Sequence, residues 1–240
     1  MNVIILTTGI SGSSVMTGFL AKAGFWTGDE TVYKDNSTGN YETYENRALV
    51  ELNEDLIKKS GLNYDSKARY DSALRDDFDA LSQKINPSAF TNFINKCDSH
   101  SPWIWKDPRL IITIGFWKNL IDLENTQFIV IYRNSYELWK SQASKRIIFD
   151  YGYLTQIEED TRNDLFGYLK SHNLSYLPVE YDSITSKPEP EIRKLNAFLK
   201  ADLTIEDWNT IYRSTNKIDN FKRTAFAFLI YVKNYSSRIR

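Results

Sequence analysis

The sequence begins with Asn2-Val-Ile-Ile-Leu-Thr-Thr8, which continues directly into Gly9-Ile-Ser-Gly-Ser-Ser14 and then into Val15-Met-Thr-Gly-Phe-Leu-Ala-Lys-Ala23. The first segment is a short apolar run with β-branched residues, which predicts a buried strand. The second is a tight loop of small residues, and the third has the character of a helix that ends at Gly24. This succession predicts an anion-binding site, because backbone N–H groups and the helix dipole then point at one spot.

Within this loop, Gly9 and Gly12 let the backbone approach a ligand, and Ser11, Ser13 and Ser14 add hydroxyl donors. We therefore expect a phosphate-like or sulfate-like group to bind here. A purely structural role stays open, in which the glycines shape the turn and Ser11 caps the helix. The loop lacks the Lys of a Walker A motif, which argues against an ATPase or kinase of the usual kind.

The composition of the 240-residue chain bounds its class. Lys and Arg number 30 against 31 Asp and Glu, so the net charge of −1 provides no overall field for nucleic acid or an acidic membrane, and any anion site has to be local. The single cysteine, Cys97, excludes an intramolecular disulfide and a Cys-based zinc site. With neither a signal-peptide pattern nor a membrane-length apolar run, we expect a soluble cytoplasmic protein that binds neither nucleic acid nor membrane.

The remaining segments alternate between strand and helix patterns. Strands are predicted at 103–106, 127–132 and 175–179, the second being an uninterrupted apolar run typical of a central parallel strand. Helices are predicted at 42–59, 74–85, 88–97, 110–123, 136–149, 154–171, 189–199 and 205–212. Segment 221–232 fits either a helix or a strand, and 25–40 and 63–71 are predicted as connections. The alternation predicts one α/β domain, 1–240, with a mostly parallel central sheet and helices on both faces.

In open parallel sheets, ligands bind beyond the carboxyl ends of the strands, so the residues after each strand are candidates for a site. Lys106 and Arg109 follow the second predicted strand, and Arg133 follows the third, with Ser141 eight positions farther on. Together with the Gly/Ser loop, these cations would form an anion site at one edge of the sheet. Each cation also has a structural alternative, such as an ion pair of Arg109 with Asp107.

These features, taken in order, resemble the sulfotransferases that use 3′-phosphoadenosine 5′-phosphosulfate (PAPS). In that family, the loop after the first strand binds the 5′-phosphosulfate, and an Arg with a Ser eight positions on binds the 3′-phosphate; Arg133 and Ser141 have that spacing. Trp105-Lys-Asp-Pro-Arg-Leu110 looks like the second motif of bacterial members. Gly39-Asn-Tyr-Glu42 is similar to a Gly-Tyr-aromatic-Glu segment, and Pro178-Val-Glu-Tyr181 resembles a late strand–helix unit of the family.

The resemblance implies a P-loop NTPase-like sulfotransferase architecture with a helical and loop insertion at about 25–100 that contacts the acceptor. It implies PAPS as the donor, PAP as the product, no required metal, and a small-molecule or carbohydrate acceptor with a hydroxyl or amine. The residues implied in binding the cofactor are Gly9, Ser11, Gly12, Ser13, Ser14, Arg133 and Ser141.

For catalysis, our hypothesis is that Lys106 stabilises the charge that develops on the leaving phosphate, with Arg109 as a further cation. The general base is expected to be a carboxylate, with Glu42 first because of its motif and Asp107 in reserve. Glu42 also has a structural alternative, which is to open the following helix and complement its dipole.

The chain departs from the family pattern at Ile10, where the loop usually has Lys or Arg. Its absence either weakens catalysis or passes the function of that cation to Lys106 or Arg109. The Arg-Lys-Gly loop of many cytosolic members is also missing near the C-terminus. Two other classes therefore stay open: a P-loop nucleotide or small-molecule kinase, and a non-catalytic nucleotide-binding protein, for which Ile10 is the best evidence.

Overall fold

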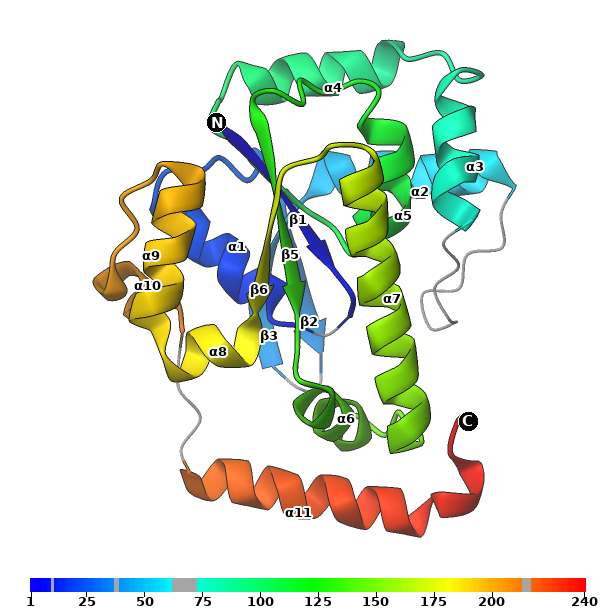
Figure 1. Ribbon diagram of the computed structural model, residues 1–240, viewed down its shortest axis with the longest axis vertical. Helices are drawn as coiled ribbons and strands as arrows, with labels where there is room; N and C mark the ends of the chain where they lie inside the picture. Colours follow the sequence, from blue (N-terminus) through cyan, green and yellow to red (C-terminus); the bar gives the residue numbers. More distant parts are fainter. Residues whose placement is uncertain (10, 37–38, 62–72, 213–216) are drawn as a thin grey trace.

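A parallel sheet of four strands lies at the centre of the protein, in a computed structural model that describes residues 1–9, 11–36, 39–61, 73–212 and 217–240 (Figure 1). The strands are β1 (Asn2–Thr7), β4 (Ile104–Lys106), β5 (Thr126–Tyr132) and β6 (Tyr176–Glu180), in the spatial order β4-β1-β5-β6. All neighbouring pairs are parallel, so the carboxyl ends of the strands lie at one edge of the sheet. The predicted α/β class with a mostly parallel sheet is confirmed.

The side chains of β1 alternate between the two faces of the sheet, and both faces are buried. Ile4 and Leu6 belong to the core on one face, and Val3 and Ile5 to the core on the other. The first face is covered by α2 (Arg47–Ser60), α3 (Ala73–Ser82), α4 (Ser88–Asp98), α5 (Leu110–Trp117) and α7 (Tyr151–Ser171). The second is covered by α1 (Ser13–Lys22), α8 (Tyr181–Ser186), α9 (Pro188–Leu199) and α10 (Ile205–Ile211) (Figure 1). The expectation of helices on both faces is therefore confirmed.

The segment after α1 differs from its prediction. The sequence predicts a loop at 25–40 and a helix from Glu42, whereas the structure has an antiparallel hairpin of β2 (Thr31–Asn36) and β3 (Gly39–Asn46). The helix α2 starts later because Asn46 is its N-cap and accepts hydrogen bonds from two backbone N–H groups of the first turn. Before this cap, Tyr and Thr side chains favour the extended backbone of a strand over a helix.

The elements beyond the carboxyl edge also differ from prediction. The helix α6 (Ser135–Ser144) ends before the predicted Phe149, because the chain turns away with a left-handed φ of 62° at Arg146. The helix α5 likewise ends earlier than predicted, and α8 is not predicted. The C-terminal segment is a helix, α11 (Lys217–Lys233), followed by a 3₁₀ turn (Tyr235–Ser237). Figure 1 shows α11 packed against α6, beyond the carboxyl ends of the strands.

Two features of the sequence analysis, the charged connection at 63–71 and Ile10, fall outside the described residues. Within the described part of the chain, no helix combines the length and the apolar character needed to cross a membrane.

Candidate functional site

The Gly/Ser loop leads from the end of β1 to the start of α1. Gly12 is the N-cap of α1 with a left-handed φ of 78°, and no side chain of the described residues caps the helix there. Ser11, the cap that the sequence offers, instead contacts the Thr7 hydroxyl through its own hydroxyl. The first backbone N–H groups of α1 are therefore left for solvent or a ligand, which is the arrangement that binds anions at helix N-termini.

A tyrosine from another strand end packs on this loop. A β-carbon at Gly12 would lie 2.1 Å from Cε2 of Tyr181, the first residue after β6, so only glycine fits there. The guanidinium of Arg133, after β5, lies 5.5 Å from the centre of the same ring. Burial raises the pKa of Tyr181 to about 12, so the phenol is neutral at physiological pH. The Tyr181 ring thus connects the loop to the cation at the end of β5.

Lys106, at the end of β4, also reaches the loop. Its Nζ donates a hydrogen bond to Oγ of Ser14 over 3.3 Å and forms an ion pair with Glu45 of β3. The side chains of Lys106 and Glu45 are 3% and 6% exposed, so the pair is almost fully removed from solvent. Burial lowers the pKa of Lys106, and Glu45 opposes this effect. Glu45 therefore holds the ammonium against the first turn of α1.

Asp107 and Arg109 are engaged with α2 rather than with the loop. Asp107 is fully buried and accepts hydrogen bonds from Asn53 and from the backbone and side chain of Arg109. Arg109 also forms an ion pair of 2.5 Å with Glu54. Burial raises the pKa of Asp107, while the charge of Arg109 and these hydrogen bonds lower it. The structural alternative given for Arg109, an ion pair with Asp107, is therefore present.

Asn53 connects this pair to the core. Its side-chain oxygen accepts hydrogen bonds from Thr113 and from Nε1 of Trp117, both over 2.8 Å. The Lys-Asp-Pro-Arg turn is thus held by a buried polar network.

Arg133 follows β5 and is 13% exposed. Its Nε donates to Oδ1 of Asp182 over 3.2 Å, and its Nη2 lies 3.6 Å from Oε2 of Glu137. Asp182 also accepts a hydrogen bond from the backbone N–H of Asn134. The two carboxylates fix the guanidinium beside Tyr181 while leaving other N–H groups of the fork without these partners.

Further cations surround this end of β5. Burial lowers the pKa of Lys145, and the positive charges of Arg223, Lys34 and Arg133 lower it further. Burial and the charge of Arg133 likewise lower the pKa of Arg223 on α11. Ser141, which the sequence pairs with Arg133, lies on α6 and is 2% exposed. Like charges from β2, from the residues that follow β5 and α6, and from α11 thus come together here.

Glu42 is occupied locally. It lies on β3 opposite Tyr33, and its Oε1 accepts a hydrogen bond of 3.1 Å from the backbone N–H of Tyr44. Tyr44 has a left-handed φ of 56°, which is uncommon for a residue with a side chain, and its ring packs on Gly18 of α1. The Glu42 carboxylate therefore stabilises a strained turn that docks the hairpin on α1.

Several residues of this site were missed from the sequence. Glu45 lies on β3 and points inward with Thr43, and no clear sequence pattern marks this strand. Asp182, the partner of Arg133, was also missed, although it lies just after a predicted strand, where candidate site residues are expected. No sequence signal announced Lys145 or Arg223, because only the packing of α11 on α6 brings them to β5.

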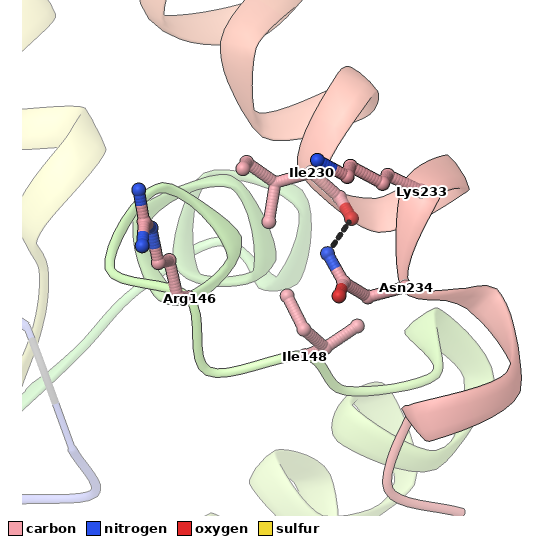
Figure 2. Close-up of a pocket in the computed structure, with 5 residues that line it drawn as sticks. All are labelled: Arg146, Ile148, Ile230, Lys233 and Asn234. Atoms are coloured by element: carbon pink, nitrogen blue, oxygen red, sulfur yellow. Dashed lines mark hydrogen bonds between the residues drawn. The ribbon is translucent and has the colours of Figure 1, made fainter.

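A separate hollow of about 220 Å³ lies between the α6–α7 connection and α11 (Figure 2). In Figure 2 the side chains of Ile148 and Ile230 point toward each other, and Asn234 donates a hydrogen bond to the backbone oxygen of Ile230. The hollow is smaller than typical ligand pockets of about 300–1,000 Å³. None of the predicted site residues lines it, and we assign it no ligand. Among the residues described, no cluster of His, Cys, Asp and Glu could hold a metal ion.

No protein-family model matches the chain, and no curated protein matches its sequence. Among solved structures, it is similar to the "Sulfotransferase Domain from the Curacin Biosynthetic Pathway", with a TM-score of 0.54 and 13% identity over 89% of this chain and 78% of that one. It is also similar to the "Sulfotransferase Domain from the Synechococcus PCC 7002 Olefin Synthase", with a TM-score of 0.50 and 18% identity over 94% and 85% of the two chains. The chain therefore has the fold of sulfotransferase domains.

Proposed function

We propose that the protein transfers the sulfuryl group of PAPS to a hydroxyl or amine of a small-molecule or carbohydrate acceptor. The observation that carries this proposal is the convergence of an uncapped helix N-terminus with cations from β4 and β5, the two strands that flank β1. Lys106 donates a hydrogen bond to Ser14 in the first turn of α1. Arg133 packs on the ring of Tyr181, which in turn packs on Gly12. The sulfotransferase fold supports the same conclusion by analogy.

At the donor end, the backbone N–H groups of Ser11 to Ser14 and the hydroxyls of Ser13 and Ser14 would bind the 5′-phosphosulfate. Gly9 and Gly12 would let the backbone approach it. Lys106 is held in place by Glu45 and points at Ser14, so it would stabilise the negative charge that develops on the leaving phosphate. Since Glu45 already fixes the ammonium, little reorganisation is needed during transfer.

At the other end, Arg133 and Ser141 would bind the 3′-phosphate, with a planar charged fork and a hydroxyl. The surrounding charges of Lys145 and Arg223 favour an anion there, because each is close to other cations in a partly buried setting. Arg223 would thereby contribute what the absent Arg-Lys-Gly loop contributes in other members.

The acceptor side is assigned to the insertion at about 25–100. Its hairpin touches the site, since β3 packs against α1 and β4 and carries Glu45 to Lys106, and its helix α2 contacts Asp107 and Arg109 through Asn53 and Glu54. Arg109, in the same turn as Lys106, would add a second positive charge on this side of the site. Glu42 is proposed as the general base in preference to Asp107, because the buried oxygens of Asp107 already accept hydrogen bonds from Asn53 and Arg109.

The test of the base is the pH profile of Glu42→Gln. If Glu42 accepts the acceptor's proton, the variant loses activity on the order of a hundredfold. Activity is measured as PAP release with an acceptor found by screening. The matched control is Glu51→Gln, which removes an exposed carboxylate from α2. Unchanged activity across pH would remove Glu42 as the base.

The test of the function is a calorimetric titration with PAP, beside adenosine 5′-phosphate and ATP with Mg²⁺. We expect PAP to bind at micromolar level or tighter and far above the other two. A preference for ATP would favour a kinase, binding of PAP without transfer to any acceptor would favour a binding protein, and no binding at all would overturn the proposal.

A further inference from the structure

The helix α7 carries a buried carboxyl group beside the Gly/Ser loop that the proposed reaction does not use. Glu158 is 3% exposed, and one of its oxygens accepts a hydrogen bond from the Thr8 hydroxyl, directly after β1. A β-carbon at Gly9 would lie 4.0 Å from its other oxygen. The carboxyl group therefore faces the start of the loop at which the proposed donor binds.

Burial raises the pKa of Glu158 to about 7, against the opposing effects of the Thr8 hydrogen bond and the charge of Arg162. Arg162 lies on the same helix, and its guanidinium stands 4.9 Å from the ring centre of Tyr132 on β5. Burial and the charge of Glu180 on β6 raise the pKa of Tyr132, so this phenol is neutral near pH 7. Among the described residues, Arg162 is the charged group that acts on this carboxyl, and Arg162 and Glu180 both act on Tyr132.

We propose that Glu158 is a positioning residue that takes up a proton when the Gly/Ser loop binds a sulfuryl or phosphoryl anion, and so couples anion binding to pH. The inference rests on the proposed function, since it concerns the same loop. The proton comes from solvent and forms an O–H bond on the carboxylate, and no other bond changes. In the neutral form, Glu158 keeps its contact with Thr8 and places no negative charge beside the anion.

The direction of the pH effect follows from the like charges. An anion in the loop disfavours the ionised carboxylate, so the pKa of Glu158 is higher in the complex than in the free protein. Above about pH 7, binding must be accompanied by proton uptake, and the dissociation constant rises by up to about tenfold per pH unit. Below about pH 6, Glu158 is already protonated and the affinity is independent of pH.

The experiment uses inorganic sulfate as the probe, because its charge is constant over the range of about pH 6 to about pH 9, at constant ionic strength. Its dissociation constant is measured calorimetrically for the wild type, for Glu158→Gln and for Glu159→Gln, which removes an exposed carboxylate from the same helix. We expect the wild type and Glu159→Gln to weaken above about pH 7, and Glu158→Gln to keep the affinity that the wild type has at about pH 6. Parallel curves for all three proteins, or no sulfate binding by any of them, would overturn the proposal.

A second variant keeps the proposal falsifiable if Glu158→Gln does not fold. Thr8→Val removes the hydrogen bond that lowers the pKa of Glu158, so the bend in the sulfate curve moves to higher pH. An unmoved bend would contradict the proposal.

Stability without ligand provides an independent readout. The folded pKa of Glu158 lies above the unfolded value of about 4.3, so the folded state binds more protons between about pH 4 and about pH 7. The free energy of unfolding of the wild type should therefore fall with rising pH over that window, relative to Glu158→Gln. An equal slope in both proteins would mean that the carboxyl group does not titrate as proposed.

The same proteins are then titrated with PAP, which separates the two proposals. Sulfate binding that depends on Glu158, without any preference for PAP, would leave the inference standing and overturn the sulfotransferase function. Tight PAP binding with the same pH profile in the wild type and Glu158→Gln would do the reverse.

Discussion

The carboxyl ends of β4 and β5 both carry cations, but at one end each cation is balanced by a carboxylate partner and at the other it is not. After β4, Lys106 and Arg109 meet Glu45, Asp107 and Glu54, so two cations face three carboxylates. Around the end of β5, the carboxylates of Glu137 and Asp182 pair with Arg133 and Lys140, while Lys145 and Arg223 lie close to Arg133. Lys34 of β2 adds a fifth positive charge, so among the residues that the structure describes five cations there meet two carboxylates.

This difference distinguishes a pre-organised cation from a cation that awaits a ligand. At the end of β4 the carboxylate of Glu45 neutralises Lys106 and fixes its position, so that removal of Lys106 lowers the stability of the fold. At the end of β5 the cations repel one another in the free protein, and a bound anion would relieve this repulsion. Removal of a cation should therefore lower stability at the first end and ligand affinity at the second.

The largest expected effect is on stability at the balanced end. In Lys106→Ala the carboxylate of Glu45 stays buried without its partner, which should lower the free energy of unfolding by about 3–5 kcal/mol. The double variant Lys106→Met with Glu45→Gln should recover most of this loss, because neither buried charge remains. Urea unfolding measures both. A single variant as stable as the wild type would mean that the pair is not buried together.

The second effect is on selectivity at the surplus end. Arg133→Ala should lower the affinity for PAP by about 10- to 100-fold and leave that for adenosine 5′-phosphate nearly unchanged, because a charged hydrogen-bond donor to the 3′-phosphate is lost. Calorimetry with both nucleotides measures the ratio, with Arg193→Ala as a control that removes an exposed arginine from α9. If the preference for PAP survives, Arg133 does not contact the 3′-phosphate.

The smallest effect separates direct contact from long-range attraction. Arg223→Gln and Lys145→Gln should each weaken PAP binding by about twofold to fivefold at low salt, and the loss should shrink as ionic strength rises. Neither should lower the unfolding midpoint, because each relieves repulsion among cations. Lys222→Gln, an exposed neighbour on α11, is the control. A loss of stability in place of affinity would show that these charges are already balanced.

The sheet was predictable because its strands are marked by local patterns. The uninterrupted apolar runs at 2–7 and 127–132 are typical of central parallel strands. Each run is followed by a small residue or a cation at the carboxyl edge of the sheet. The hairpin at 31–46 was missed because its polar, Tyr-rich strands show neither an apolar run nor a clear alternation. Because a helix was predicted from Glu42, the ion pair between Glu45 of β3 and Lys106 was not predicted either.

The sequence by itself determined the α/β class, the Gly/Ser loop between β1 and α1, and the positions of Lys106 and Arg133 at one edge, because these depend on local patterns and on the direction of parallel strands. Only the tertiary structure decided which carboxylates pair with each of these cations. The partners of Lys106, Arg133 and the Thr8 hydroxyl lie about 50 to 150 residues away in the chain, on β3, α8 and α7. Pairing across such separations depends on how whole elements pack, which no local pattern of residues records.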